Sequence, residues 1–159
     1  MENVKRKLYL MMGIPGAGKS TYLKTKVSEQ PFKVISRDKI RFSIVKEDEE
    51  YFSHENEVYA EFIHQTKEAL NEYSEVYIDA THLNEASRTK TLKALGESLK
   101  NVEVNIIYVR TPLEVAIAQN ENRKGTRAYV PVEVIRRMNS QLTLPSKEEG
   151  FEHIYIIEK

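Results

Sequence analysis

The residues with the clearest chemical meaning form a glycine-rich stretch near the start of the chain, Gly13-Ile14-Pro15-Gly16-Ala17-Gly18-Lys19-Ser20. Apolar residues precede it and good helix formers follow it, which is the strand–loop–helix setting of a phosphate-binding loop. The glycines let the backbone curl without Cβ clashes, so successive N–H groups can point at one anion. Lys19 would reach the β- and γ-phosphates of ATP, and the Ser20 hydroxyl would ligate Mg²⁺. The expected ATP-binding residues are Gly13, Pro15, Gly16, Ala17, Gly18, Lys19, Ser20 and Thr21.

Two aspartates that follow predicted strands are candidates for the metal and the acceptor. Asp79 ends an apolar strand over 75–79, where it would hold Mg²⁺ together with Ser20; the alternative is a helix-capping aspartate. Asp38 follows a short strand over 32–36, at the edge of an open α/β sheet where ligands bind. A hydroxyl acceptor needs a carboxylate to orient it and accept its proton, so Asp38 is the catalytic candidate, with a simple cap as the alternative. Arg41 either holds an acceptor phosphate or covers the surface, and both interpretations stay open.

A polar and basic segment between about 121 and 131 is predicted to be a mobile lid. Arg123, Lys124 and Arg127 surround Gly125 there, with little apolar sequence. In a phosphotransferase such a segment brings positive charge onto the γ-phosphate in the transition state, so Arg123 and Arg127 are further catalytic candidates. Charge runs are usually solvated faces, and this interpretation depends on the phosphate-binding loop. Arg110 is a weaker candidate.

Composition narrows the class of protein. The 159 residues fit one domain with a hydrophobic core, and we expect a single domain over 1–159. No apolar run approaches membrane-spanning length, and the amino terminus lacks a signal peptide, which favours a cytoplasmic enzyme without membrane contact. The absence of cysteine excludes disulfides, thiolate zinc sites and cysteine nucleophiles. The four histidines lack any metal-ligand spacing and are expected to be surface or partly buried residues.

The charge distribution is uneven although the net charge is zero. Residues 1–45 hold ten Lys/Arg against three Asp/Glu, whereas residues 46–75 hold ten acids against two lysines. A broad polyanion-binding surface would show as an overall basic excess. Any nucleic-acid contact should therefore be local, at a short end rather than along a duplex.

Strands and helices are predicted to alternate along the whole chain. The expected strands are 7–12, 32–36, 75–79, 102–109 and 153–157. The expected helices are 18–28, 37–46, 51–73, 83–99, one starting at Pro112 with Thr111 as its cap, and 131–142. This alternation predicts a parallel sheet that is covered by helices on both faces.

Several segments, in order, resemble the 5′-hydroxyl polynucleotide kinase domain of bacteriophage T4 type, within the P-loop kinase superfamily. The matching segments are 13–21, Ile35-Ser36-Arg37-Asp38 with Arg41-Phe42-Ser43-Ile44, Asp79-Ala80-Thr81-His82-Leu83-Asn84 with Arg88, Asn122-Arg123-Lys124-Gly125-Thr126-Arg127, Val130-Pro131 and Val134-Ile135. The segment 144–152 looks like that of related small kinases, where it often borders the adenine. In the phage-type kinase, the aspartate of the third motif directly precedes a threonine. In this chain Ala80 stands between Asp79 and Thr81, as in related small kinases.

The resemblance implies a P-loop α/β sandwich with five parallel strands in the order 2-3-1-4-5 and transfer of the γ-phosphate from ATP to a 5′-hydroxyl end. It implies that Asp38 is the general base, that Arg41 steadies the acceptor phosphate with Thr81 beside it, and that Lys19 and Ser20 bind triphosphate and metal. An arginine of the segment 123–127, Arg123 or Arg127, matches the lid arginine. In contrast to that family, residues 1–159 are not expected to include the phosphatase partner domain.

The predicted function is therefore an ATP- and Mg²⁺-dependent kinase that acts on a hydroxyl acceptor, foremost a nucleic-acid 5′ end. A kinase for a small acceptor is the first alternative, favoured by the zero net charge and the acidic stretch. A slowly hydrolysing nucleotide switch and a toxin-like kinase of related fold are others. The acceptor, DNA or RNA preference, ATP or GTP preference and oligomeric state stay open.

Overall fold

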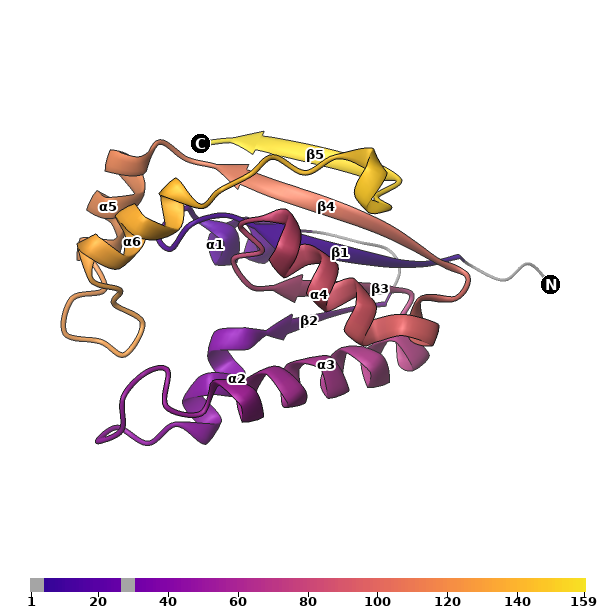
Figure 1. Cartoon of the computed structure of the whole chain (residues 1–159), viewed down its shortest axis with the longest axis horizontal. Helices are drawn as coiled ribbons and strands as arrows, with labels where there is room; N and C mark the ends of the chain where they lie inside the picture. Colours follow the sequence, from indigo (N-terminus) through magenta and orange to yellow (C-terminus); the bar gives the residue numbers. More distant parts are fainter. Residues whose placement is uncertain (1–4, 27–30) are drawn as a thin grey trace.

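A five-stranded parallel sheet forms the centre of the computed structural model, which describes residues 5–26 and 31–159 (Figure 1). The strand order is β2-β3-β1-β4-β5, as predicted. Every neighbouring pair is parallel. The strands are β1 Arg6–Met12, β2 Phe32–Ser36, β3 Glu75–Asp79, β4 Val102–Arg110 and β5 His153–Glu158. Because all strands run the same way, their carboxyl ends meet at one edge of the sheet, where the loops that follow β1, β2 and β3 lie together.

Helices connect the strands. They are α1 Lys19–Thr25, α2 Arg37–Ile44, α3 Glu55–Glu72, α4 Glu85–Leu95, α5 Leu113–Glu121 and α6 Val132–Ser140, with short 3₁₀ turns η1 Gly96–Leu99 and η2 Lys147–Glu149. The predicted helix over 51–73 begins four residues late, because residues 51–54 form a turn, and the one over 83–99 divides into α4 and η1. The predicted first helix over 18–28 ends early, at Thr25, because Lys26 is already extended; residues 27–28 lie outside the described residues. Among the described residues, no helix is both long and apolar enough to cross a membrane.

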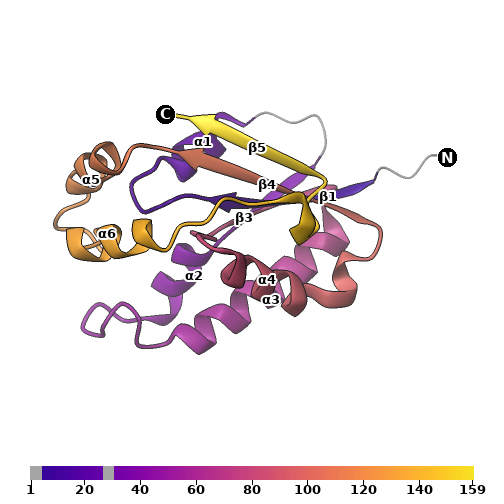
Figure 2. The same ribbon diagram turned by 45° about the horizontal axis from the view of Figure 1, so that its top comes forward.

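The sheet has a hydrophobic core on each face, because successive side chains of a strand point to opposite faces. On β1, Leu8 and Leu10 belong to one core and Met11 to the other. The first core packs against α3 and α4, with Phe62 fully buried in it. The second core packs against α1, α5 and α6, with Ile135 fully buried. Figure 2 shows α3 and α4 on one side of the sheet and α1 on the other, which is the predicted three-layer arrangement.

The predicted cap of α5 is wrong in detail. Pro112 is the residue that precedes the helix, and no side chain caps it. The hydroxyl of Thr111 is buried and donates to the carbonyl oxygen of Ala17 at 2.7 Å. Thr111 therefore ties the end of β4 to the glycine-rich loop instead of starting a helix.

Candidate nucleotide and acceptor site

The glycine-rich loop between β1 and α1 is held on two sides. The Gly13 N–H donates to the carbonyl oxygen of Thr81, 3.1 Å away in the segment after β3. Gly16 and Gly18 have positive φ values of 85° and 99°, a region that favours glycine. A Cβ on Gly16 would lie only 2.2 Å from the carbonyl oxygen of Ala116 in α5. The loop therefore has the glycines that its curvature and its close packing on α5 require.

Lys19, Ser20 and Asp79 meet at the carboxyl ends of β1 and β3. The Lys19 ammonium donates to the Gly13 carbonyl oxygen at 3.0 Å, and the Ser20 hydroxyl donates to Asp79 Oδ2 at 3.2 Å. A hydroxyl and a carboxylate oxygen are ligands that Mg²⁺ accepts, so the predicted pair fits this metal. The structure brings together the residues predicted for the phosphates and the metal.

Burial and opposite charge shape the protonation of this group. Burial lowers the pKa of Lys19, while the carboxylates of Asp79 and Asp38 raise it in part. Burial raises the pKa of Asp79, while Lys19 and the Ser20 hydroxyl lower it in part. Arg123 lowers the pKa of both groups through its charge. Lys19 and Asp79 therefore lie within electrostatic reach of each other and of Asp38 and Arg123.

Asp38 lies in the first turn of α2, next to a buried arginine. Arg41 is 5% exposed, so its interpretation as a surface residue is wrong. Its Nε and Nη2 donate to the two carboxylate oxygens of Glu55 at 2.9 and 2.7 Å, and its Nη1 donates to Asp38. Tyr51 also donates its hydroxyl hydrogen to Asp38 Oδ1, at 2.6 Å. Asp38 thus carries a network that the sequence did not indicate.

The predicted lid is the irregular segment between α5 and α6. The buried side chain of Asn120 holds its two ends together, because it donates to the Val130 carbonyl oxygen at 2.6 Å and accepts from the Val130 N–H at 3.1 Å. The two predicted lid arginines differ in place. Arg123 is half-buried near Lys19 and Asp79, whereas Arg127 is exposed and donates to the carbonyl oxygens of Phe42 and Val45 at the end of α2.

A pocket of about 160 Å³ lies where the lid meets α2 and the loop after it. Arg41, Tyr51 and Arg127 line it, together with the carboxylates Glu47 and Glu49. The acidic stretch therefore borders a pocket that is also lined by Arg41 and Tyr51, the two residues that contact Asp38. The other two candidates lie apart from these contacts: Thr81 is half-buried behind the glycine-rich loop, and Arg110 is exposed and paired with Glu158.

One histidine departs from its prediction. His82 is 4% exposed and has a left-handed backbone with φ of 45°. Its Nδ1 lies 2.7 Å from the carbonyl oxygen of Met11, a contact in which Nδ1–H donates. Burial lowers the pKa of His82 to about 4. His82 is therefore a neutral internal residue that joins the segment after β3 to β1.

The protonation of His82 predicts a pH-dependent stability. The ordinary pKa is 6.5 and the folded value is about 4, so between these values the unfolded chain binds a proton that the folded chain does not. Stability is complete above pH 6.5 and is lost as pH falls, by about 3 kcal/mol in all. Urea unfolding at pH 7 and pH 5 measures this loss. His82→Asn, which tolerates the left-handed backbone, should show a flatter pH profile; parallel profiles would contradict the assignment.

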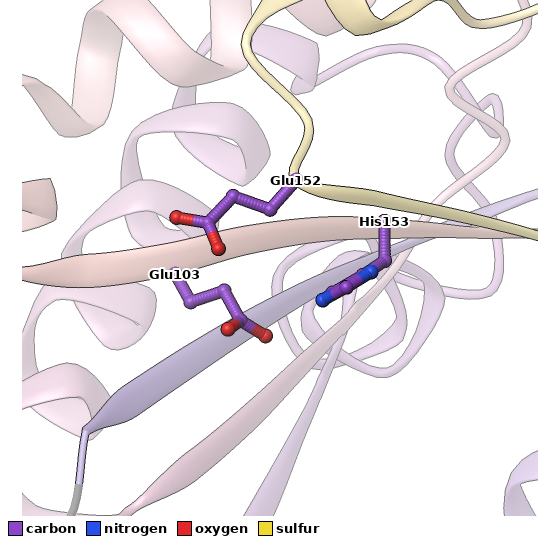
Figure 3. A group of neighbouring side chains, drawn as sticks. All are labelled: Glu103, Glu152 and His153. Atoms are coloured by element: carbon purple, nitrogen blue, oxygen red, sulfur yellow. The ribbon is translucent and has the colours of Figure 1, made fainter.

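A second group of side chains could hold a metal ion, away from the glycine-rich loop. Within residues 5–26 and 31–159, Glu103, Glu152 and His153 have ligand atoms that all lie within 4.8 Å of one another (Figure 3). The spacing of the histidines in the sequence does not indicate this group, because Glu103 is remote in sequence from His153. Lys5 already lies 3.4 Å from Glu152, and the group is largely exposed at the amino ends of β4 and β5. It takes no part in the candidate site.

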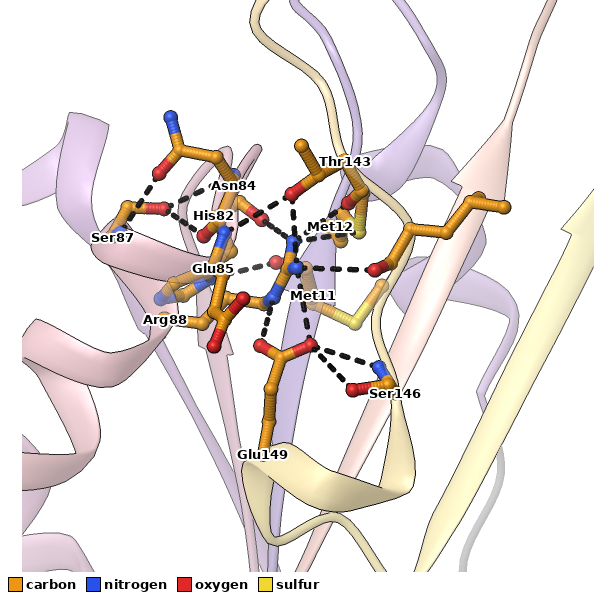
Figure 4. A network of polar contacts seen from close by, with 11 residues as sticks. Met11, Met12, His82, Asn84, Glu85, Ser87, Arg88, Thr143, Ser146 and Glu149 are labelled. Atoms are coloured by element: carbon orange, nitrogen blue, oxygen red, sulfur yellow. Dashed lines mark hydrogen bonds and ion pairs between the residues drawn. The ribbon is translucent and has the colours of Figure 1, made fainter.

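The C-terminal segment is joined to the site by a buried ion pair that the sequence did not predict (Figure 4). The Arg88 side chain is fully buried, and Glu149 is 4% exposed. Nε of Arg88 donates to Glu149 at 2.7 Å, and Nη1 donates to the carbonyl oxygens of His82 and Thr143, each at 3.0 Å. This arginine fastens the segment after α6 to the segment that follows Asp79.

Comparisons with known proteins agree with this architecture. A family model described as an AAA domain matches residues 8–145, which is most of the chain. Among curated proteins, transcription factor bHLH140 of Arabidopsis thaliana is 24% identical over 159 residues. The match covers 96% of this chain and 16% of that protein, so the chain spans a small part of this relative's length.

Three solved structures share the fold. A chain of the Pnkp1/Rnl/Hen1 RNA repair complex has a TM-score of 0.66 at 20% identity, over 89% of this chain and 45% of that one. Kti12 of Chaetomium thermophilum in complex with ADP-AlF3 has a TM-score of 0.66 at 16% identity, over 95% of this chain and 88% of that one. A gluconokinase of Sinorhizobium meliloti 1021 has a TM-score of 0.57 at 15% identity, over 99% of this chain and 84% of that one. At such identities the likeness establishes the fold alone. The fold of this chain is that of the P-loop α/β proteins, and the chain belongs to the AAA domain family.

Proposed function

We propose that this protein is a phosphotransferase that moves the γ-phosphate of ATP to a hydroxyl acceptor, and that the acceptor is the 5′-hydroxyl end of a polynucleotide. The observation that carries the proposal is that Lys19 and Asp79, at the carboxyl ends of β1 and β3, lie within electrostatic reach of Asp38 and Arg123. A nucleotide-binding switch would need the loop and the metal ligands. A second carboxylate and a lid arginine at the same place are what transfer to an acceptor requires.

The proposed mechanism assigns one task to each side chain. The glycine-rich loop from Gly13 to Thr21 cradles the triphosphate, and Lys19 neutralises its β- and γ-phosphates. Asp38 orients the acceptor hydroxyl and takes its proton as the oxygen bonds to the γ-phosphorus, while the bond from that phosphorus to the β–γ bridging oxygen breaks and ADP leaves. Ser20 and Asp79 would hold Mg²⁺, which when bound neutralises charge on the phosphates. The single domain expected over 1–159 would then carry all of these parts.

Arg123 is the better candidate for the lid arginine. It is half-buried and its charge acts on Lys19 and Asp79, so it lies on the phosphate side of the site. Arg127 instead donates to backbone carbonyl oxygens at the end of α2, with its guanidinium 4.8 Å from the Phe42 ring centroid. We assign charge stabilisation at the γ-phosphate to Arg123, and to Arg127 the closure of the lid over the acceptor pocket.

The polynucleotide acceptor is supported by the motif order around Asp38 and the lid and by the shared fold with a chain of the RNA repair complex. A small acceptor is the second candidate, because Glu47 and Glu49 line the same pocket as Arg41 and Tyr51 and would repel a polyanion. One protein of the same fold is named a gluconokinase, and its name indicates a small acceptor. In this alternative, Arg41 would border a small polyol or nucleoside in place of a nucleic-acid phosphate.

Acceptor-stimulated ADP release distinguishes these candidates. The rate would be measured with ATP and Mg²⁺ alone, then with a 5′-hydroxyl oligonucleotide of DNA or RNA, the same oligonucleotide with a 5′-phosphate, nucleosides, and gluconate. We expect stimulation by the 5′-hydroxyl oligonucleotide and none by its 5′-phosphorylated form. Stimulation by gluconate or a nucleoside alone would move the function to the small-acceptor candidate. Equal slow hydrolysis in every mixture would favour a switch.

A further inference from the structure

The carboxylate of Asp38 is held at one of its two oxygens. Its Oδ1 accepts a hydrogen bond from the Tyr51 hydroxyl at 2.6 Å and another from Nη1 of Arg41. In the part of the chain that the structure describes, Oδ2 has no donor within hydrogen-bond distance, and the side chain is 50% exposed. One oxygen is therefore occupied from the protein side, and the other is left for an acceptor on a half-exposed side chain.

Glu55 holds the arginine that makes this contact. Arg41 donates Nε and Nη2 to the two Glu55 oxygens, and Arg37 adds a third contact to the same carboxylate at 3.2 Å. A paired, side-on carboxylate fixes the plane of a guanidinium. The orientation of this plane directs the remaining Nη1 of Arg41, which donates to Asp38 Oδ1 and to the Tyr51 oxygen 2.7 Å away. The chain of contacts runs from Glu55 on α3 through Arg41 to Asp38 on α2.

Tyr51 acts as a donor in this network. Burial, followed by the nearby Asp38 charge, raises the pKa of the Tyr51 hydroxyl well above its ordinary value, so it keeps its proton. Its ring lies against the Arg41 guanidinium, 4.3 Å from centroid to Cζ, and is in edge contact with Phe52. The ring therefore has packing of its own, independent of the hydroxyl.

We propose that Tyr51 and Glu55 are positioning residues that fix the Asp38 carboxylate so that Oδ2 alone receives the acceptor proton. This inference rests on the proposed function. The terminal torsion of an aspartate is broad and nearly two-fold, so an unrestrained carboxylate would rotate. Restraint of a catalytic group raises the fraction of encounters with productive geometry. Tyr51 and Glu55 would contribute to the rate through Asp38, without touching ATP.

The test is a double-mutant cycle between Tyr51→Phe and Asp38→Asn, with the 5′-hydroxyl oligonucleotide as acceptor. Tyr51→Phe removes one oxygen and keeps the ring, and Tyr73→Phe makes the same change at the end of α3, away from the site. We expect Tyr51→Phe to lower kcat about tenfold with the KM for ATP unchanged. In the Asp38→Asn background it should cause no further loss, since residues that act as a unit are not additive. Tyr73→Phe should match wild type.

Each outcome decides between the claims. If Asp38→Asn is slow while Tyr51→Phe keeps wild-type kcat, or if the two losses multiply, the positioning role is wrong and the proposed function stands. If wild type transfers no phosphate, or Asp38→Asn is as fast as wild type, the proposed function fails and this inference fails with it. Glu55→Gln should behave as Tyr51→Phe does in both backgrounds. A Glu55→Gln variant with wild-type kcat would remove Glu55 from the network.

Discussion

Replacing Asp38 by asparagine is expected to slow acceptor-dependent phosphate transfer by about 10²- to 10⁴-fold. Asparagine has nearly the same shape, and its amide oxygen can still accept from Tyr51 and Arg41, so the contacts seen at Oδ1 persist. It cannot accept the proton of the acceptor hydroxyl. The measurement is kcat with a 5′-hydroxyl oligonucleotide, beside the dissociation constant of ATP from calorimetry.

The dissociation constant should stay at its wild-type value, because Asp38 is placed at the acceptor and not at the phosphates. Asp48→Asn is a matched control, since Asp48 is exposed in the acidic loop after α2. It should leave both quantities unchanged. A loss of ATP affinity that accounts for the whole effect of Asp38→Asn would refute the general-base role.

Breaking the buried ion pair between Arg88 and Glu149 is expected to produce the largest loss of stability. Arg88→Met should lower the free energy of unfolding by about 3–5 kcal/mol, because it leaves a buried carboxylate without its partner. The carbonyl oxygens of His82 and Thr143, which accept hydrogen bonds from Nη1 of Arg88, also lose a donor. Urea unfolding at pH 7 measures the difference.

Two further variants separate the loss of charge pairing from the loss of packing. Arg88→Met with Glu149→Leu removes both charges and should recover part of the loss, as apolar replacements of buried pairs do. Arg136→Met breaks an exposed ion pair, because the side chains of Arg136 and Glu114 are 47% and 73% exposed. It should lower the free energy of unfolding by less than about 1 kcal/mol. Equal losses for Arg88→Met and Arg136→Met would show that the buried pair has no special role.

The parts of the fold that could be predicted depend on local sequence. The glycine-rich loop is contiguous, and the apolar runs 8–12 and 104–109 predict buried parallel strands, which the structure contains. The placement of Asp79 and Asp38 at one edge follows from the rule that parallel strands end together. The chemical roles of these residues remain proposals.

The parts that could not be predicted depend on contacts between remote residues. Tyr51 contacts Asp38 from a turn over 51–54, which the apolar spacing predicted to be helical. Glu149 pairs with Arg88, which lies 61 positions earlier in the chain. Thr111 followed by a proline is the ordinary signal of a helix start, but its hydroxyl finds the carbonyl oxygen of Ala17 instead. The full burial of His82 could not be predicted, because a buried histidine has no sequence signature of its own; a surface or partly buried residue was expected.

The most direct test of the central claim is to find where the γ-phosphate goes. Wild-type protein would be incubated with γ-labelled ATP, Mg²⁺ and a single-stranded 5′-hydroxyl oligonucleotide, with Lys19→Ala as the blank. We predict that label appears on the 5′ end of the oligonucleotide, that a phosphatase removes it, and that Lys19→Ala produces none. ATP consumption by wild type with no label on the oligonucleotide would contradict the polynucleotide kinase assignment.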